Sequence, residues 1–148
     1  DDFTTRPGVP NAFGLVQSPH NEVAAGKRPL SSMSPTILLR DGRTFMVVGG
    51  AGGPAIITGT LQAILGVVDF DRAALAAVSA PRIHHQWVPD TLHLEPGFAP
   101  ETQSGLLARG HALSEAPKRS IVQVIVLRGR TGLEAASDPR KGGRPAGR

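Results

Sequence analysis

The chain has 148 residues, 40% of them hydrophobic, which is enough for one domain-sized core. Its formal charge of +4 is uneven, because residues 118–148 hold 8 Lys/Arg against 2 Asp/Glu, whereas the first 117 residues hold 8 against 10. With no tyrosine and one tryptophan, the basic C-terminal part is typical of a solvated edge, so we expect no nucleic-acid partner. No apolar run approaches the ~20 residues that cross a bilayer, and the lack of cysteine leaves the redox compartment open.

The first 34 residues are rich in Pro, Gly, Asn and Ser, a composition that does not form a core of its own. Two interpretations follow, a linker or an extended segment that lines a site. The chain begins at Asp1 without a methionine, so we expect a processed or truncated piece, with any export signal upstream.

The next stretch predicts a hairpin. Thr36 to Arg40 and Thr44 to Val48 are β-favouring runs, and Asp41-Gly42 between them suits a turn with positive φ. A glycine loop, residues 49–53, follows directly.

A helix is expected after this loop, with Pro54 in its first turn, where proline is tolerated. Apolar residues that recur at helical spacing predict this helix: Ile57, Leu61, Ile64, Leu65 and Val68.

The rest of the chain mixes the two kinds of element. Asp71 is expected to cap a short helix over residues 72–79, Pro100 to open another that ends at Gly110, and residues 83–89 to be irregular. The expected strands are Thr91 to Glu95 and Ser120 to Leu127, the latter paired with Leu133 to Ala136 across a turn at residues 128–132. This order predicts the α+β class, with residues 1–148 as one unit and 141–148 as a flexible tail.

The glycine loop admits three interpretations. Residues 50–55 fit a loose G-x-G-x-x-A dinucleotide pattern, but the preceding strand pairs in a hairpin, which fits that pattern poorly. Alternatively, the N–H groups of Gly52 and Gly53, at a helix N-terminus, hold a developing oxyanion. A purely structural tight turn is the third interpretation.

Other polar residues are weaker candidates. Ser31, Ser32 and Ser34 lie in a turn stiffened by prolines and can donate to an anion, although turn serines often only cap the local backbone. Asp1 and Asp2 can accept from a ligand ammonium. Three histidines make a poor metal set without a suitably spaced carboxylate, so we expect them to be structural: His84, His85 and His93.

Together these stretches resemble the γ-glutamyltransferase family, in the C-terminal part of its small subunit. The resemblance covers nearly the whole chain and lies in six segments in family order: DDF (1–3), RPGVPNAFGLV (6–16), GKRPLSSMSPTILLRDG (26–42), GGAGGPAIIT (49–58), SAPRIHHQWVPD (79–90) and ASDPR (136–140).

The resemblance implies an N-terminal nucleophile hydrolase fold, a four-layer αββα sandwich of which this chain supplies part. It implies self-cleavage of a precursor into large and small subunits, no cofactor, and a periplasmic or secreted location. A freed N-terminal threonine would attack γ-glutamyl compounds such as glutathione and pass the glutamyl group to water, an amino acid or a dipeptide.

By position, Asp2 resembles the acid that binds the substrate α-ammonium, and Ser31 and Ser32 resemble the pair that binds its α-carboxylate. Gly52 and Gly53 resemble the oxyanion-hole glycines. The residues beside them depart from many bacterial relatives, which often have Ser-Pro at 50–51 and Ser-Arg at 54–55.

The family's nucleophilic threonine would lie upstream of these motifs, since Thr4 and Thr5 follow DDF. We therefore expect this chain alone to be inert toward a γ-glutamyl anilide. Three alternatives remain: a related acylase that accepts a glutaryl β-lactam precursor, a non-catalytic remnant or binding module, and a dinucleotide-binding domain.

Overall fold

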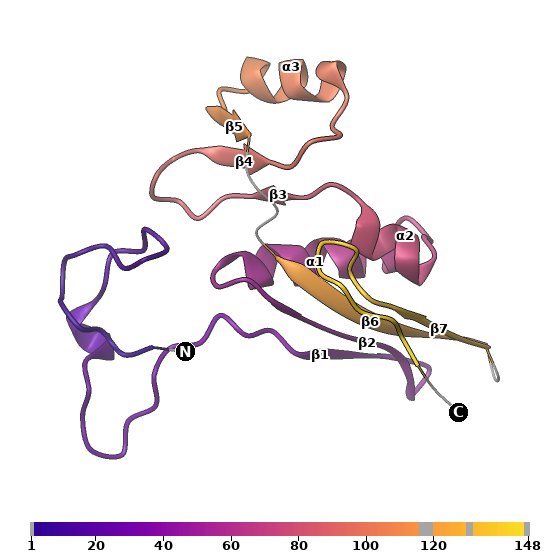
Figure 1. Cartoon of the computed structure of the whole chain (residues 1–148), viewed down its shortest axis with the longest axis horizontal. Helices are drawn as coiled ribbons and strands as arrows, with labels where there is room; N and C mark the ends of the chain where they lie inside the picture. Colours follow the sequence, from indigo (N-terminus) through magenta and orange to yellow (C-terminus); the bar gives the residue numbers. More distant parts are fainter. Residues whose placement is uncertain (1, 116–119, 130–131, 147–148) are drawn as a thin grey trace.

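In the computed structural model, which describes residues 2–115, 120–129 and 132–146, the main sheet has four antiparallel strands. Figure 1 shows them in the order β1-β2-β6-β7. Their bounds are Thr36–Arg40 for β1, Arg43–Ala51 for β2, Ile121–Arg128 for β6 and Gly132–Ala136 for β7. The predicted hairpin is confirmed, with Asp41 and Gly42 at φ 52° and 73° in its turn. The predicted pairing of the last two strands is also confirmed.

Two helices, α1 (Ala55–Val68) and α2 (Ala74–Ser79), cover one face of this sheet (Figure 1). Alternate residues of β2 and β6 face them and form the core, because successive strand side chains point to opposite faces. The fully or nearly fully buried core residues include Met46, Val48, Val122, Val124 and Val126 from the strands and Ala63, Val67, Ala77 and Val78 from the helices.

A smaller unit follows α2 in the chain. Its three-stranded sheet has the order β3-β4-β5, with β3 at Ile83–His84, β4 at Leu92–Leu94 and β5 at Leu113–Glu115, and it carries the exposed helix α3 (Pro100–Ala108). Figure 1 shows this unit beside the helices, away from the main sheet. The strand near residue 93 and the helix opened by Pro100 were predicted, whereas β5 was not.

The helix α1 exists where its apolar spacing predicts it, but the residues that show this spacing do not face the sheet. Ile57, Leu61, Leu65 and Val68 are exposed, and Ile64 is half-buried. Small residues face the sheet instead: Gly59 lies so close to Ser120 that an added Cβ would collide with that side chain. Close approach to the sheet therefore selects small residues on the buried side of the helix.

Two further expectations at element ends were wrong. Asp71 does not cap α2; its carboxylate pairs with Arg128 at 3.0 Å, and Glu134 of β7 accepts from the Ala74 N–H at 2.9 Å instead. The predicted glycine loop also begins later, since β2 runs on to Ala51 and only Gly52 and Gly53 form the turn.

A buried ionic cluster joins the main sheet to the smaller unit. It consists of Arg82, Glu95, Asp138 and Arg140; Asp138 is 0% exposed. The Asp138 carboxylate lies 2.8 Å from Arg82 and 3.0 Å from Arg140, and it accepts from the Val122 N–H at 2.9 Å. Arg140 also pairs with Glu95, next to the end of β4.

The surroundings of Asp138 within this cluster favour the charged state of its carboxylate. Burial alone would raise the pKa of Asp138, but the N–H groups of Arg140 and Val122 and the two guanidinium groups lower that pKa on balance. Burial lowers the pKa of Arg82, against the opposing effect of Asp138.

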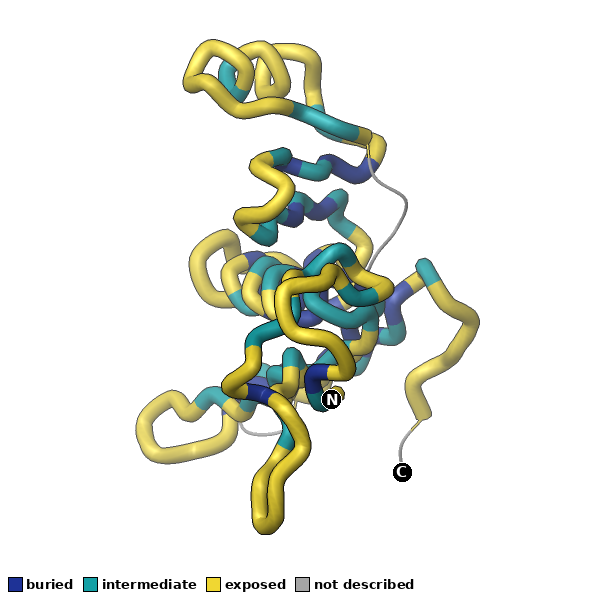
Figure 2. The backbone as a smooth tube through the Cα atoms, turned by 90° about the vertical axis from the view of Figure 1, so that its left-hand side faces the viewer, coloured by how far each residue is buried: buried dark blue, intermediate teal, exposed yellow. Residues whose placement is uncertain are grey.

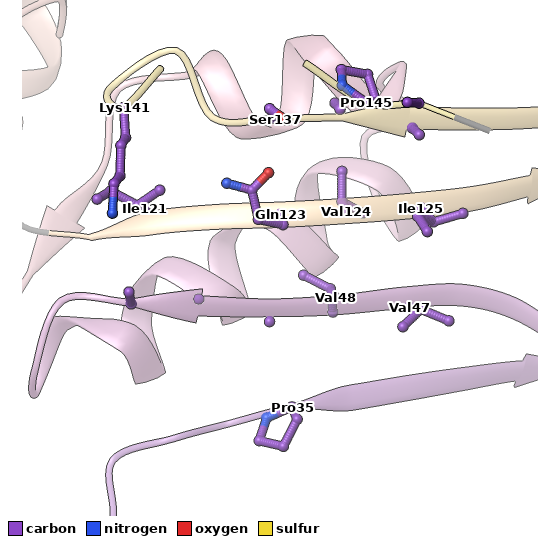
Figure 3. A pocket seen from close by; sticks show the side chains of 16 residues that line it. Pro35, Val47, Val48, Ile121, Gln123, Val124, Ile125, Ser137, Lys141 and Pro145 are labelled. Carbon is purple, nitrogen blue, oxygen red and sulfur yellow. The ribbon is translucent and has the colours of Figure 1, made fainter. Parts of the chain in front are cut away.

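The far face of the main sheet has no covering layer within the described residues. Exposed apolar side chains lie on it: Ile37, Leu39, Val47, Ile125 and Leu133. A largely apolar groove of about 680 Å³ runs over this face between Pro35 and the C-terminal segment at Pro145 (Figure 3). Lys141 points toward Ile121 across the groove. The tail predicted at 141–148 thus borders the groove as far as Ala146, and its last two residues lie outside the described part.

The N-terminal segment, residues 2–34, has little regular structure beyond the short 3-10 helix η1 (Pro19–Asn21). Figure 2 shows it as mostly exposed, with isolated buried positions. It leads into β1 (Figure 1).

Candidate functional site

Asp2 lies directly beside the residue that precedes the two candidate serines. Asp2 and Leu30 form an isolated antiparallel bridge. Buried Asn21 holds this bridge, because its Nδ2 donates to the Asp2 carbonyl at 2.8 Å and its Oδ1 accepts from the Leu30 N–H at 3.0 Å. Two motifs nearly thirty residues apart are therefore adjacent in space. Sequence analysis missed Asn21, and no pattern around it would have indicated this role.

The serines keep donor capacity for a ligand. Ser31 is exposed and Ser32 half-buried. The Ser31 Oγ accepts from the Met33 N–H at 3.1 Å, the local capping typical of turn serines. A hydroxyl that accepts one bond still has its own hydrogen to donate, so Ser31 can bind an anion while it caps the turn.

Gly52 and Gly53 connect the end of β2 to the start of α1. Their φ angles are 134° and 59°, a conformation that side chains disfavour. No backbone hydrogen bond among the described turns, loops and caps uses either N–H as its donor. Both N–H groups lie close to the N-terminus of α1, whose dipole favours negative charge there. This turn can therefore hold an anionic oxygen.

The serine segment and the diglycine turn approach each other along the β1–β2 pair. Thr36 pairs with Val48, and an added Cβ on Gly49 would lie 3.8 Å from the Pro35 Cα. The serine segment leads into β1 and the diglycine turn follows β2, so both continue from the same end of this strand pair. The structure thus joins Asp2 to the serine segment, but among the described residues no hydrogen bond links Asp2, the serines and the diglycine turn directly.

Phe13 is a neighbour of the turn that sequence analysis did not single out. A Cβ added to Gly53 would lie 2.7 Å from the Phe13 Cε1, so the ring rests directly on this glycine. The Phe13 carbonyl accepts from the Gln86 Nε2 at 3.0 Å. One wall of the candidate site therefore comes from the N-terminal segment.

The three histidines lie around β3 and β4. The rings of His84 and His93 stack with centroids 6.4 Å apart, and His85 pairs with exposed Asp90 at 3.0 Å. Across the described ranges, no three His, Asp or Glu side chains gather in a way that could hold a metal ion. The helices of those ranges are also too short or too polar to span a membrane.

The dinucleotide interpretation does not fit this fold. That motif needs a parallel strand-helix-strand unit, whereas β2 pairs antiparallel with both β1 and β6. A bare diglycine turn between an antiparallel strand and a helix is instead suited to acyl-group chemistry.

Comparison with known proteins shows the family of this chain. The model of the family described as Gamma-glutamyltranspeptidase matches residues 1–148. The glutathione hydrolase proenzyme of Escherichia coli (strain K12) is 46% identical over 140 residues, which cover 95% of this chain and 24% of that protein.

Solved structures are similar over most of the chain. The Helicobacter pylori gamma-glutamyltranspeptidase T380A mutant has a TM-score of 0.88 at 42% identity, covering 94% of this chain and 77% of that chain. The Pseudomonas nitroreducens gamma-glutamyltranspeptidase complexed with L-DON has a TM-score of 0.86 at 41% identity, covering 99% of this chain and 77% of that chain.

The mixed α+β layers are therefore part of an N-terminal nucleophile hydrolase fold. Within that class, the chain belongs to the gamma-glutamyltranspeptidase family. It spans about a quarter of the length of the curated relatives that it matches.

Proposed function

We propose that this chain supplies the glutamate-recognition groups and the oxyanion hole of a γ-glutamyltransferase that acts on glutathione and other γ-glutamyl compounds. The observation that carries the proposal is the Asn21 clamp, which holds Asp2 beside the serine turn. Acid and hydroxyls at one place match the ammonium and carboxylate that share the α-carbon of a γ-glutamyl group.

In this proposal each group has one partner on the substrate. The Asp2 carboxylate accepts from the α-ammonium, and the Ser31 and Ser32 hydroxyls donate to the α-carboxylate. These contacts leave the γ-carbonyl free to extend toward the diglycine turn. There the N–H groups of Gly52 and Gly53 stabilise the oxygen as it gains negative charge.

The reaction then proceeds by acyl transfer. A threonine hydroxyl attacks the γ-carbonyl, the tetrahedral intermediate expels the amine of the leaving peptide with a proton, and a glutamyl ester remains. Water, or the amine of an amino acid or dipeptide, attacks this ester and restores the hydroxyl. The threonines of the N-terminal segment are poor candidates for this nucleophile, because Thr4 is buried with its hydroxyl on the Ser18 carbonyl at 2.7 Å, and the Thr5 hydroxyl binds Gln17 at 3.2 Å.

We therefore place the nucleophile in the remainder of a protein of the relatives' length. The same remainder, including the large subunit of the precursor, would cover the open face of the main sheet. The groove on that face ends against Gly49–Ala51 and Pro35, so a covering strand would lie close to the diglycine turn. The family resemblance also supports a periplasmic or secreted location.

The role of Asp2 can be tested in the complete protein that contains this chain. For Asp2→Ala we expect a lower kcat/KM for glutathione, because the substrate ammonium loses its partner. The loss should correspond to about 2 to 5 kcal/mol of transition-state stabilisation. An unchanged kcat/KM would show that Asp2 does not bind the substrate.

The same variant distinguishes a glutamyl-specific enzyme from the acylase alternative. A glutaryl substrate has no α-ammonium, so Asp2→Ala should leave its turnover nearly unchanged while it impairs glutathione hydrolysis. Equal losses on both substrates would contradict the assigned role. Absence of any turnover by the complete wild-type protein would favour the remnant or binding module.

A further inference from the structure

The segment from His84 to Gln86 has no role in the proposed chemistry, yet its side chains link three distant parts of the chain. His84 is 7% exposed, and its Nδ1 lies 2.8 Å from the Thr58 Oγ1 in the first turn of α1. Its Nε2 lies 3.2 Å from the Gln86 Oε1. Both ring nitrogens are therefore engaged by named partners.

The direction of these hydrogen bonds follows from the Gln86 amide. Its Nε2 donates to two carbonyls, that of Phe13 at 3.0 Å and that of Val88 at 3.3 Å. Carbonyls only accept, so the Gln86 Oε1 must face His84 and accept from its Nε2–H. The Thr58 Oγ1, 2.8 Å from the His84 Nδ1, also lies 3.3 Å from the Ala55 carbonyl, so its one hydrogen is shared between these two acceptors. The result is a relay of hydrogen bonds that connects α1 through His84 and Gln86 to Phe13.

The end of the relay lies on the diglycine turn. Phe13 belongs to a turn that Asn11 stiffens, because its Oδ1 accepts from the N–H groups of Phe13 at 2.9 Å and Leu15 at 3.1 Å. The Phe13 ring rests on Gly53, as described above. Since α1 also begins at this turn, the relay closes a ring of contacts around the two candidate oxyanion donors.

We propose that His84 and Gln86 are positioning residues, which hold Phe13 against Gly53 and so fix the wall of the oxyanion site. The positioning of Phe13 is argued from the contacts above, and the effect of this positioning on glutamyl transfer rests on the proposed function. Neither residue contacts Asp2 or the serine turn among the described hydrogen bonds, so glutamate recognition is not their task. Their loss should alter the chemical step rather than substrate binding.

The test compares four forms of the complete protein: wild type, Gln86→Met, His84→Ala and the control His85→Gln. Gln86→Met keeps the side chain's size and removes both polar groups of the Gln86 amide, the acceptor for His84 and the donor to Phe13. His85 is the adjacent residue of the same type as His84, but it contacts exposed Asp90 and the Trp87 N–H instead. The readouts are hydrogen exchange of the residue 11–15 amides, followed by mass spectrometry, and the separate kcat and KM for glutathione.

For Gln86→Met and His84→Ala we expect faster exchange at residues 11–15 and a kcat about 10- to 100-fold lower with KM little changed, because a displaced wall disturbs the reacting geometry. The control should match wild type in both readouts. Unchanged exchange in Gln86→Met would overturn the positioning role, and faster exchange with unchanged kcat would overturn its link to the reaction. If the wild type turns over no γ-glutamyl compound, the proposed function fails, and exchange alone decides whether the relay positions Phe13.

Discussion

At the scale of single residues, the candidate site is assembled by an amide that contacts no substrate group. Asn21 uses both ends of its side chain, one on Asp2 and one on Leu30. Asn21 itself is buried, whereas Asp2 and Leu30 are exposed, so the two hydrogen bonds of Asn21 fasten two exposed segments together. Glutamate recognition would therefore depend on a residue outside every motif that suggested the family.

Removing this clamp should affect both stability and substrate binding. For Asn21→Ala in the complete protein we expect a loss of about 1 to 3 kcal/mol in the free energy of unfolding, because two hydrogen bonds worth about 0.5 to 1.5 kcal/mol each are removed. KM for glutathione should rise as Asp2 loses its fixed place. Asn21→Asp, which keeps the acceptor for the Leu30 N–H and loses the donor to Asp2, serves as the comparison. Denaturant titration and steady-state kinetics would measure both effects, and an unchanged KM in Asn21→Ala would contradict the clamp.

At the scale of elements, local sequence patterns predicted most of the helices and strands. Tertiary contacts decided which face of a helix is buried and which residues satisfy its ends. Alternation and the Asp41-Gly42 turn were sufficient for β1 and β2, since these depend on neighbours in the chain. The buried face of α1 was not predictable in this way, because Ile57 and Leu61 are exposed and Gly59 meets the sheet. The partner that satisfies the start of α2, Glu134, lies 60 residues away from Ala74, so no local signal could reveal it.

The candidate site shows the same division. Asp2, Ser31, Ser32 and the diglycine turn came from family motifs and local chemistry, and their assigned roles stay predictions. Phe13 and Gln86 reach the site only through long-range contacts, which are invisible in a single sequence.

The buried ionic cluster holds several elements together, so its disruption should be costly. For Asp138→Asn we expect a loss of about 3 to 5 kcal/mol in the free energy of unfolding near neutral pH, because Arg82 loses its buried carboxylate partner and Arg140 keeps only Glu95. Asp90→Asn is the matched control, since Asp90 is 95% exposed and should change stability little. Equal unfolding midpoints for the two variants would contradict a stabilising role for the cluster.

The same carboxylate predicts a pH dependence. The pKa of Asp138 is lowered in the folded state, so the unfolded chain binds its proton first, at about the ordinary value of 3.8. Its contribution is therefore present above that value and is lost as pH falls through the lower folded pKa. Denaturant titrations of wild type and Asp138→Asn from pH 7 down to about pH 3 should show the difference shrinking at the acidic end. A difference that grew on acidification would contradict the lowered pKa.

At the scale of the whole molecule, the described residues cover one face of the main sheet and leave its other face open. The helices bury the core on one side, while Ile125, Leu39 and their neighbours remain exposed on the other. An apolar sheet face of this kind indicates a missing partner layer, as the length of the relatives also suggests. The chain is thus one part of a layered fold.

A substitution on the open face tests this directly. Ile125 is 40% exposed here, and if the remainder of the complete protein covers it, Ile125→Ala should cost about 2 to 5 kcal/mol in the free energy of unfolding. Val23→Ala, at a position 74% exposed on the N-terminal segment, should stay within about 0.5 kcal/mol of wild type. Similar small effects for both variants would mean that the face stays open.

The most direct test of the account is a crystal structure of the complete protein with bound glutamate, the product of γ-glutamyl hydrolysis. The account predicts the ammonium group within hydrogen-bond distance of the Asp2 carboxylate, the α-carboxylate on the Ser31 and Ser32 hydroxyls, and the γ-carboxylate facing the N–H groups of Gly52 and Gly53. Glutamate bound with its α-carbon away from Asp2 and the serines would contradict it.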